Sequence, residues 1–75
     1  MSPKLPRITA AELLSALHRD GWYDVRQSGS HLSLQHPEKT NTVTVPRHRG
    51  TLRLGTLRSI LDQAGLSADN LQKLL

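Results

Sequence analysis

The chain of 75 residues has no cysteine and no phenylalanine, and its only tryptophan and tyrosine are Trp22 and Tyr23. Without cysteine, neither a disulfide nor a thiolate metal site can stabilise the fold. So few aromatic side chains argue against a platform on which successive bases of a nucleic acid stack. If the protein binds nucleic acid, we expect it to recognise phosphates and shape.

No run of apolar residues exceeds two, whereas a membrane-spanning helix needs roughly 20. We therefore expect no membrane span, no signal peptide and no membrane partner, which together with the lack of cysteine fits a cytoplasmic protein. Acidic residues are scarce too: ten Lys and Arg outweigh six Asp and Glu, for a net charge of +4. This balance favours an anionic partner such as nucleic acid. The length predicts one domain over residues 1–75.

A first helix is predicted after an irregular lead over residues 1–7. Thr9 can cap its first amides, Glu12 can complete a capping box with Thr9, and Ile8 can pack on Leu13 as a hydrophobic staple. Gly21 supplies a left-handed stop. The apolar stripe of this helix follows the i, i+3, i+4, i+7 pattern and consists of Ala10, Leu13, Leu14 and Leu17.

Three strands are predicted next, over residues 22–27, 31–36 and 42–45, because apolar and polar residues alternate there. We expect Ser28-Gly29 to form the first turn, or a loop longer by one or two residues. A polar connection over 37–41 joins the second and third strands. Side chains alternate between the two faces of a strand, so one face of the second strand carries Leu32, Leu34 and His36, and the other carries His31, Ser33 and Gln35.

A basic, irregular segment over residues 47–55 leads to two further helices. We expect Thr56 to cap the second helix and Gly65 to end it. Ser67 starts the third. The predicted inner faces are Leu57, Ile60, Leu61 and Ala64 in the second helix, and Ala68, Leu71, Leu74 and Leu75 in the third. This order predicts an α+β fold in which the helices cover one face of a three-stranded antiparallel sheet and the other face is open to water.

The four histidines are the candidates for chemistry. If the leucines of its strand face the core, His31 lies on the open face beside a Gly-Ser turn, where an imidazole can take and give a proton near neutral pH. Periodicity alone favours a simpler interpretation, a solvated histidine without function. His36 is expected to be structural and His18 a surface residue, while His48 either contacts phosphate or has no role. The histidine spacings fit no zinc site, so no metal is expected.

Seven pieces of the chain form a pattern that is specific in its order and spacing. They are Lys4-Leu5-Pro6-Arg7, Gly21-Trp22 with Val25-Arg26-Gln27, Gly29-Ser30-His31, His36-Pro37, Val43 to Pro46 with His48, Gly55-Thr56-Leu57-Arg58-Ser59-Ile60-Leu61 and Gln63-Ala64-Gly65-Leu66-Ser67. With these pieces the chain resembles, from Lys4 to the C-terminus, the HicA family of toxin-antitoxin mRNA interferases. The resemblance implies a fold similar to double-stranded RNA-binding domains. It also implies RNA cleavage without a metal or other cofactor, through the histidine of the Gly-Ser-His motif, here His31, and a HicB-type antitoxin that covers the active face.

The favoured hypothesis is therefore an endoribonuclease toxin that cleaves mRNA with His31 as general acid or base. Gly29 and Ser30 would shape the turn around the scissile phosphate, and the expected phosphate contacts are Arg7, Arg26, Arg47, His48, Arg49 and Arg53. One alternative is a module of the same fold that binds double-stranded RNA without cutting it, since the sequence offers no obvious acid-base partner for His31. The third hypothesis is a protein that only binds other proteins.

Overall fold

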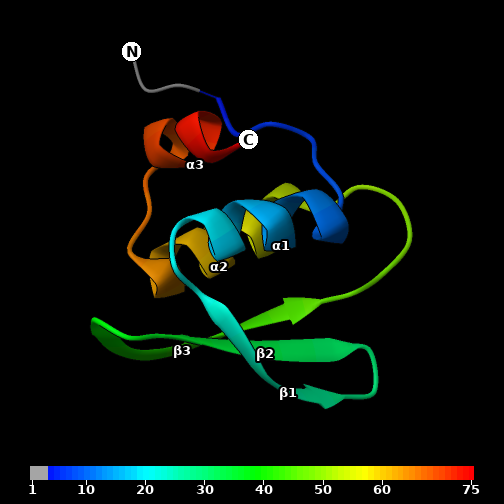
Figure 1. Ribbon diagram of the computed structural model, residues 1–75. Helices are drawn as coiled ribbons and strands as arrows, with labels where there is room; N and C mark the ends of the chain where they lie inside the picture. The colour runs from blue at the N-terminus through cyan, green and yellow to red at the C-terminus, as the bar shows by residue number, and fades with distance from the viewer. Residues whose placement is uncertain (1–3) are drawn as a thin grey trace.

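The computed structural model describes residues 4–75, and residues 1–3 of the expected irregular lead lie outside this range. The elements are, in order, α1 (Ala10–Arg19), β1 (Tyr23–Ser28), β2 (His31–His36), β3 (Lys39–Pro46), α2 (Leu54–Ala64) and α3 (Ala68–Leu74). The strands form one antiparallel sheet in the order β1-β2-β3. All helices lie on one side of it (Figure 1). The predicted α+β fold is confirmed, and no helix formed by residues 4–75 covers the other face of the sheet.

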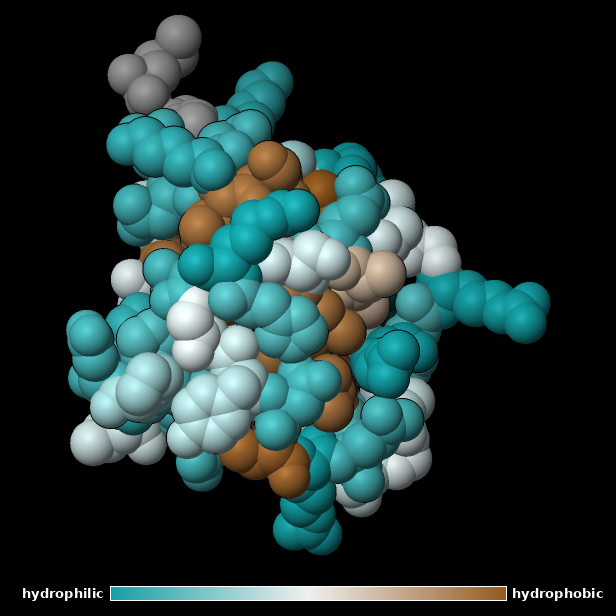
Figure 2. Space-filling model, in the orientation of Figure 1, coloured by the Kyte–Doolittle hydropathy of each residue, from teal (hydrophilic) through white to brown (hydrophobic). Residues whose placement is uncertain are grey.

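The hydrophobic core lies between the sheet and the helices. Leu32 and Leu34 of β2 are buried there, as the alternation predicts. They belong to one cluster with the apolar stripes of α1 and α2, with Val43 and Val45 of β3, and with Trp22. In the orientation of Figure 1 the surface is largely hydrophilic, and hydrophobic side chains show only in gaps between hydrophilic ones (Figure 2).

Local signals place both ends of α1 as predicted. Thr9 and Glu12 form the reciprocal capping box, with the Glu12 amide donating to Thr9 Oγ1 at 3.2 Å and the Thr9 amide donating to Glu12 Oε1 at 3.0 Å. Gly21 follows the helix with a φ of +106°, a conformation that favours glycine. A Cβ at Gly21 would also lie 2.8 Å from Nε2 of His36. The close contact between this turn and β2 therefore requires glycine.

The strand boundaries differ from the prediction in three places. β1 begins at Tyr23, and Trp22 is a core residue in front of the strand. The turn is Gly29-Ser30, because Ser28 pairs with His31; Gly29 has a φ of +59° and no other residue of the turn has a positive φ, the pattern of a type II′ hairpin. The connection to β3 is only the turn 37–38, since His36 already pairs with Lys39.

The prediction for the later helices is partly wrong. α2 begins at Leu54, so Arg53 and not Thr56 is its N-cap, and no side chain caps the helix. Gly65, with a φ of +70°, ends α2 as predicted, and Ser67 forms a capping box at the start of α3. Leu71 is buried, but Leu75 is exposed because it follows the last turn of α3. Within residues 4–75, no helix is long and apolar enough to cross a membrane.

Candidate active site

His31 is the first residue of β2 and directly follows the Gly29-Ser30 turn. Its side chain is exposed, whereas the next side chain in the strand, Leu32, is buried in the core. His31 therefore lies on the sheet face that no helix covers, at the end where β1 turns into β2 (Figure 1). An imidazole in this position is open to a large ligand such as a polynucleotide.

A second histidine lies close to His31, although it is 17 positions further along the chain. His31 pairs with Pro46 across the β2-β3 ladder, and the Arg47 amide donates to the Ser30 carbonyl oxygen at 2.6 Å. These contacts bring the chain after β3 alongside the first hairpin turn. The rings of His31 and His48 consequently meet edge to face, with centroids 6.4 Å apart and planes at 82°. The sequence alone did not predict this pair of histidines. The register between β2 and β3 is the signal from which it could have been predicted.

His48 also lines a hollow of about 400 Å³ between the end of β3 and the start of α2. Arg49 and Arg53 line the same hollow, and no carboxylate does. Guanidinium groups are suited to phosphate because they present several N–H donors in a planar fork. The structure thus brings three of the predicted phosphate-contacting side chains to one hollow, and one of them, His48, has its ring next to that of His31.

The other predicted arginines are spread more widely. Arg26 pairs with Ser33 and therefore projects from the same sheet face as His31. The guanidinium of Arg47 instead donates to Gln27 Oε1 at 3.1 Å and lines a hollow beside α1, on the helical side of the sheet. Arg7 is exposed two residues before Thr9, which bridges to Thr51. Of the predicted phosphate contacts, Arg47 thus lies on the helical side of the sheet and Arg7 lies in front of α1.

The remaining histidines have structural partners. Nε2 of His36 donates to the Asp20 carbonyl oxygen at 2.8 Å, and Nδ1 accepts from the Glu38 amide at 3.1 Å. The His36 ring also packs edge-on against Trp22, with centroids 5.3 Å apart. His18 lies on the surface as predicted, and its Nε2 is 2.7 Å from Asp24 Oδ1. The structural role predicted for His36 is confirmed.

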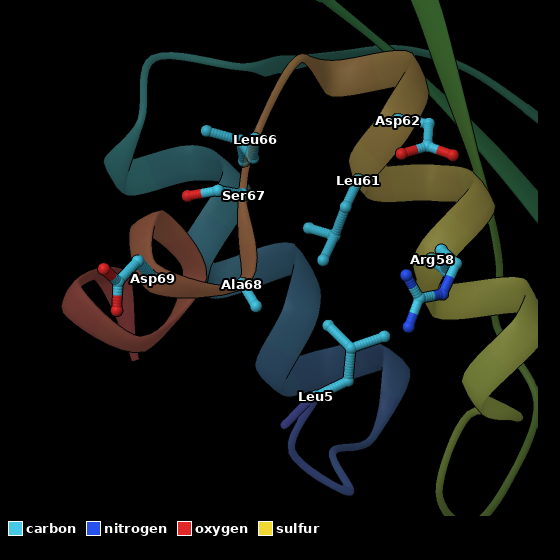
Figure 3. Close-up of a pocket in the computed structure, with 8 residues that line it drawn as sticks. All are labelled: Leu5, Arg58, Leu61, Asp62, Leu66, Ser67, Ala68 and Asp69. Atoms are coloured by element: carbon cyan, nitrogen blue, oxygen red, sulfur yellow. The ribbon is translucent and has the colours of Figure 1, made fainter. Parts of the chain in front are cut away.

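A separate hollow of about 380 Å³ lies between the N-terminal segment, α2 and the start of α3 (Figure 3). Leu5 and Leu61 point into it, and charged side chains at its rim come from α2 and α3, namely Arg58, Asp62 and Asp69. No residue of the sheet lines this hollow, so it does not belong to the surface around His31. Within residues 4–75, no group of His, Asp and Glu side chains is arranged to hold a metal ion.

By its sequence, this small α+β domain belongs to a class of bacterial toxins. The family model for the HicA toxin of bacterial toxin-antitoxin systems matches residues 10–66. The chain therefore belongs to the HicA toxin family. No curated protein matches it.

Proposed function

We propose that this toxin is an endoribonuclease that cleaves mRNA without a metal, with His31 as its general acid or base. The proposal rests chiefly on one observation: the histidine of the Gly-Ser-His sequence is exposed on the open sheet face, in a chain of the HicA family. Its ring forms no hydrogen bond within residues 4–75 and is therefore available to a substrate.

The chemistry that suits such a site is transfer of the RNA phosphodiester to its own 2′-hydroxyl. A base removes the proton of the 2′-hydroxyl, O2′ attacks phosphorus, and the bond from phosphorus to O5′ breaks while O5′ gains a proton. The products are a 2′,3′-cyclic phosphate and a 5′-hydroxyl. Histidine is suited to both proton transfers because an ordinary imidazole titrates near pH 6.5.

Substrate would be held by the positive rim of the open face. Arg49 and Arg53 are placed to bind phosphate in the hollow beside His48, and Arg26 projects from the face that carries His31. Apart from its chain neighbours, no heavy atom of residues 4–75 lies within 4 Å of a Cβ placed on Gly29, so the space beside the tight Gly29-Ser30 turn is open to a ligand. Arg7 and Arg47 would contact phosphates of the same RNA outside this surface, because Arg47 lies on the helical side of the sheet and Arg7 lies before α1.

Purified protein should therefore cut RNA in the presence of a chelator and leave fragments that end in a 2′,3′-cyclic phosphate. The binding-only alternative is a specific rival because the resemblance to the HicA family implies a fold similar to double-stranded RNA-binding domains. It predicts a shift of RNA in a native gel with no fragments. Fragments that carry a 3′-hydroxyl, or cleavage that stops with chelator, would contradict the proposed chemistry.

Binding to RNA should weaken steeply as salt rises, because phosphate contacts release condensed counterions. Replacing Arg49 by glutamine should lower the slope of log K against log salt by roughly 0.7 to 0.9, the share of one contact. Arg58→Gln is the matched control, since Arg58 lies on the exposed surface of α2 beside the other hollow. Equal slopes for the parent and Arg49→Gln would remove Arg49 from the phosphate contacts.

A HicB-like antitoxin should bind over the open sheet face and cover His31. Because this face carries arginines, we expect an acidic partner surface, and an interface of about 1,600 Å² would be ordinary for such a complex. Amide exchange should slow in β1, β2 and residues 47–50 when antitoxin is added, and stay unchanged in α3. Protection of the helices, with β1 and β2 still exchanging freely, would contradict this placement.

A further inference from the structure

We infer that His48 is the second acid-base residue of the site and exchanges protons with the substrate in partnership with His31. The inference deepens the proposed ribonuclease function and rests on it. It changes the expected role of His48 from a phosphate contact to a catalytic residue. It also supplies the acid-base partner that the sequence did not reveal.

The relative position of the two rings is the main observation behind this pairing. Their centroids are 6.4 Å apart and their planes lie at 82°. Donor and acceptor atoms in a hydrogen bond lie roughly 2.7–3.2 Å apart, and no such bond joins these rings within residues 4–75. Both rings thus have nitrogen atoms free to meet substrate, and they lie next to each other although they come from two different segments of the chain.

The other histidines cannot take this role in the observed fold. Nε2 of His18 is bound to Asp24, and both ring nitrogens of His36 have backbone partners. No carboxylate lines the hollow beside His48 to serve instead. The charged side chains that share this hollow with His48 are the guanidinium groups of Arg49 and Arg53, whereas the guanidinium of Arg47 lies on the helical side of the sheet.

The chain holds His48 firmly on both sides. Before it, the Arg47 amide is bonded to the Ser30 carbonyl at 2.6 Å. After it, Gly50 turns the chain with a φ of +80°, and Thr51 bridges to Thr9 in front of α1. Fixed backbone within three residues on each side suits a group that must be positioned for proton transfer.

Two imidazoles complete the reaction without any other reactant. The neutral ring takes the proton of the 2′-hydroxyl as the bond from O2′ to phosphorus forms. The protonated ring gives its proton to O5′ as the bond from phosphorus to O5′ breaks. The two rings end the step with their protonation states exchanged, and the cyclic phosphate and the 5′-hydroxyl account for all atoms. Water then resets the protons.

Replacing His48 by asparagine should lower kcat for RNA cleavage by about 100-fold or more, with KM changed only a few-fold. If His48 only bound phosphate, its replacement would instead raise KM and leave kcat nearly unchanged. The parent should have a bell-shaped pH dependence of kcat, and His48→Asn should lose one limb of it. His18→Asn is the matched control: it makes the same change at an exposed histidine on the helical side, and should keep the parent kcat and both limbs.

A substrate with sulfur in place of the bridging 5′ oxygen at the mapped cleavage site identifies each role. Thiolate leaves without protonation, so this substrate should restore the rate of the variant that lacks the acid and leave the other variant slow. If this substrate restores the cleavage rate of only one of the two variants, His48→Asn or His31→Ala, the result supports the assignment of one histidine as acid and the other as base. If His31→Ala is inactive while His48→Asn cleaves RNA like the parent, this inference fails and the proposed function stands. If the parent cuts no RNA, both fail.

Discussion

Replacing His31 by alanine should lower the rate of RNA cleavage by at least about 100-fold and leave the protein folded. Positioned acid-base catalysis contributes roughly 100-fold to 10,000-fold to a rate. The side chain lies on the open face, outside the core cluster, so its removal leaves no cavity among the buried residues. An exposed change of this kind alters the free energy of unfolding by only about 0.5 kcal/mol. The variant should still bind antitoxin, and a gel shift should still detect RNA binding.

The control for this experiment is His36→Ala, which removes a histidine from the other side of the same strand. Its loss breaks the hydrogen bond to the Asp20 carbonyl and the edge contact with Trp22. We expect a cost of about 1 to 3 kcal/mol in the free energy of unfolding, and cleavage close to that of the parent below the melting transition. If His31→Ala melts earlier than His36→Ala, its lost activity cannot be assigned to chemistry.

The largest loss of stability should follow from Trp22→Ala. Trp22 is only 2% exposed, its Nε1 donates to Asp20 Oδ2 at 3.2 Å, and Lys39 Nζ lies 5.4 Å from the ring centroid. Truncation of a buried tryptophan costs about 3 to 5 kcal/mol. A domain of this size has a total stability of roughly 4 to 11 kcal/mol. Urea unfolding should therefore show a much lower midpoint for the variant than for the parent, and a variant already unfolded without denaturant if the parent stability lies at the low end of this range.

Tyr23→Ala is the matched control, because Tyr23 is the adjacent aromatic residue and is 47% exposed on edge strand β1. We expect it to cost less than about 1 kcal/mol. Similar losses of stability in the two variants would show that buried Trp22 contributes no more to the free energy of unfolding than an exposed aromatic residue. That result would contradict the central place of Trp22 in the hydrophobic core.

Features that depend on residues close in sequence could be predicted. The capping box of α1 joins residues three positions apart, and the left-handed glycine that ends α2 directly follows the helix. The start of α2 was missed because Arg53 caps it without a side-chain hydrogen bond and because Gly55, a residue typical of turns, lies in the first helical turn. No local signal marks that boundary.

The length of β3 depends on contacts that sequence patterns do not display. Lys39 Nζ donates to the Ala64 carbonyl oxygen at 2.7 Å, and Asn41 Nδ2 donates to the Gln63 carbonyl oxygen at 3.2 Å. In the sequence these polar side chains indicate a loop, although they join the sheet to the end of α2. Tertiary contacts override the local preference here.

The candidate site was predictable to a similar extent. The alternation of β2 places His31 opposite the leucines, and the structure has it exposed on that face. The closeness of His48 depends on the register between β2 and β3 and on the path of the chain after Pro46. A shift of one residue in that register would turn every side chain of one strand to the other face. The sequence alone therefore could not show that His48 lies next to His31, and the folded structure was needed to show it.

The most direct test of the proposed role of His31 is the single-turnover cleavage rate of the parent and of His31→Ala, with protein in saturating excess over RNA and with chelator present. Saturation removes differences in binding, so the ratio of rates reports the chemical step. We expect a ratio of at least about 100 at equal melting temperature, and 2′,3′-cyclic phosphate ends from the parent. Equal rates for the two proteins would contradict the claim that His31 performs the cleavage.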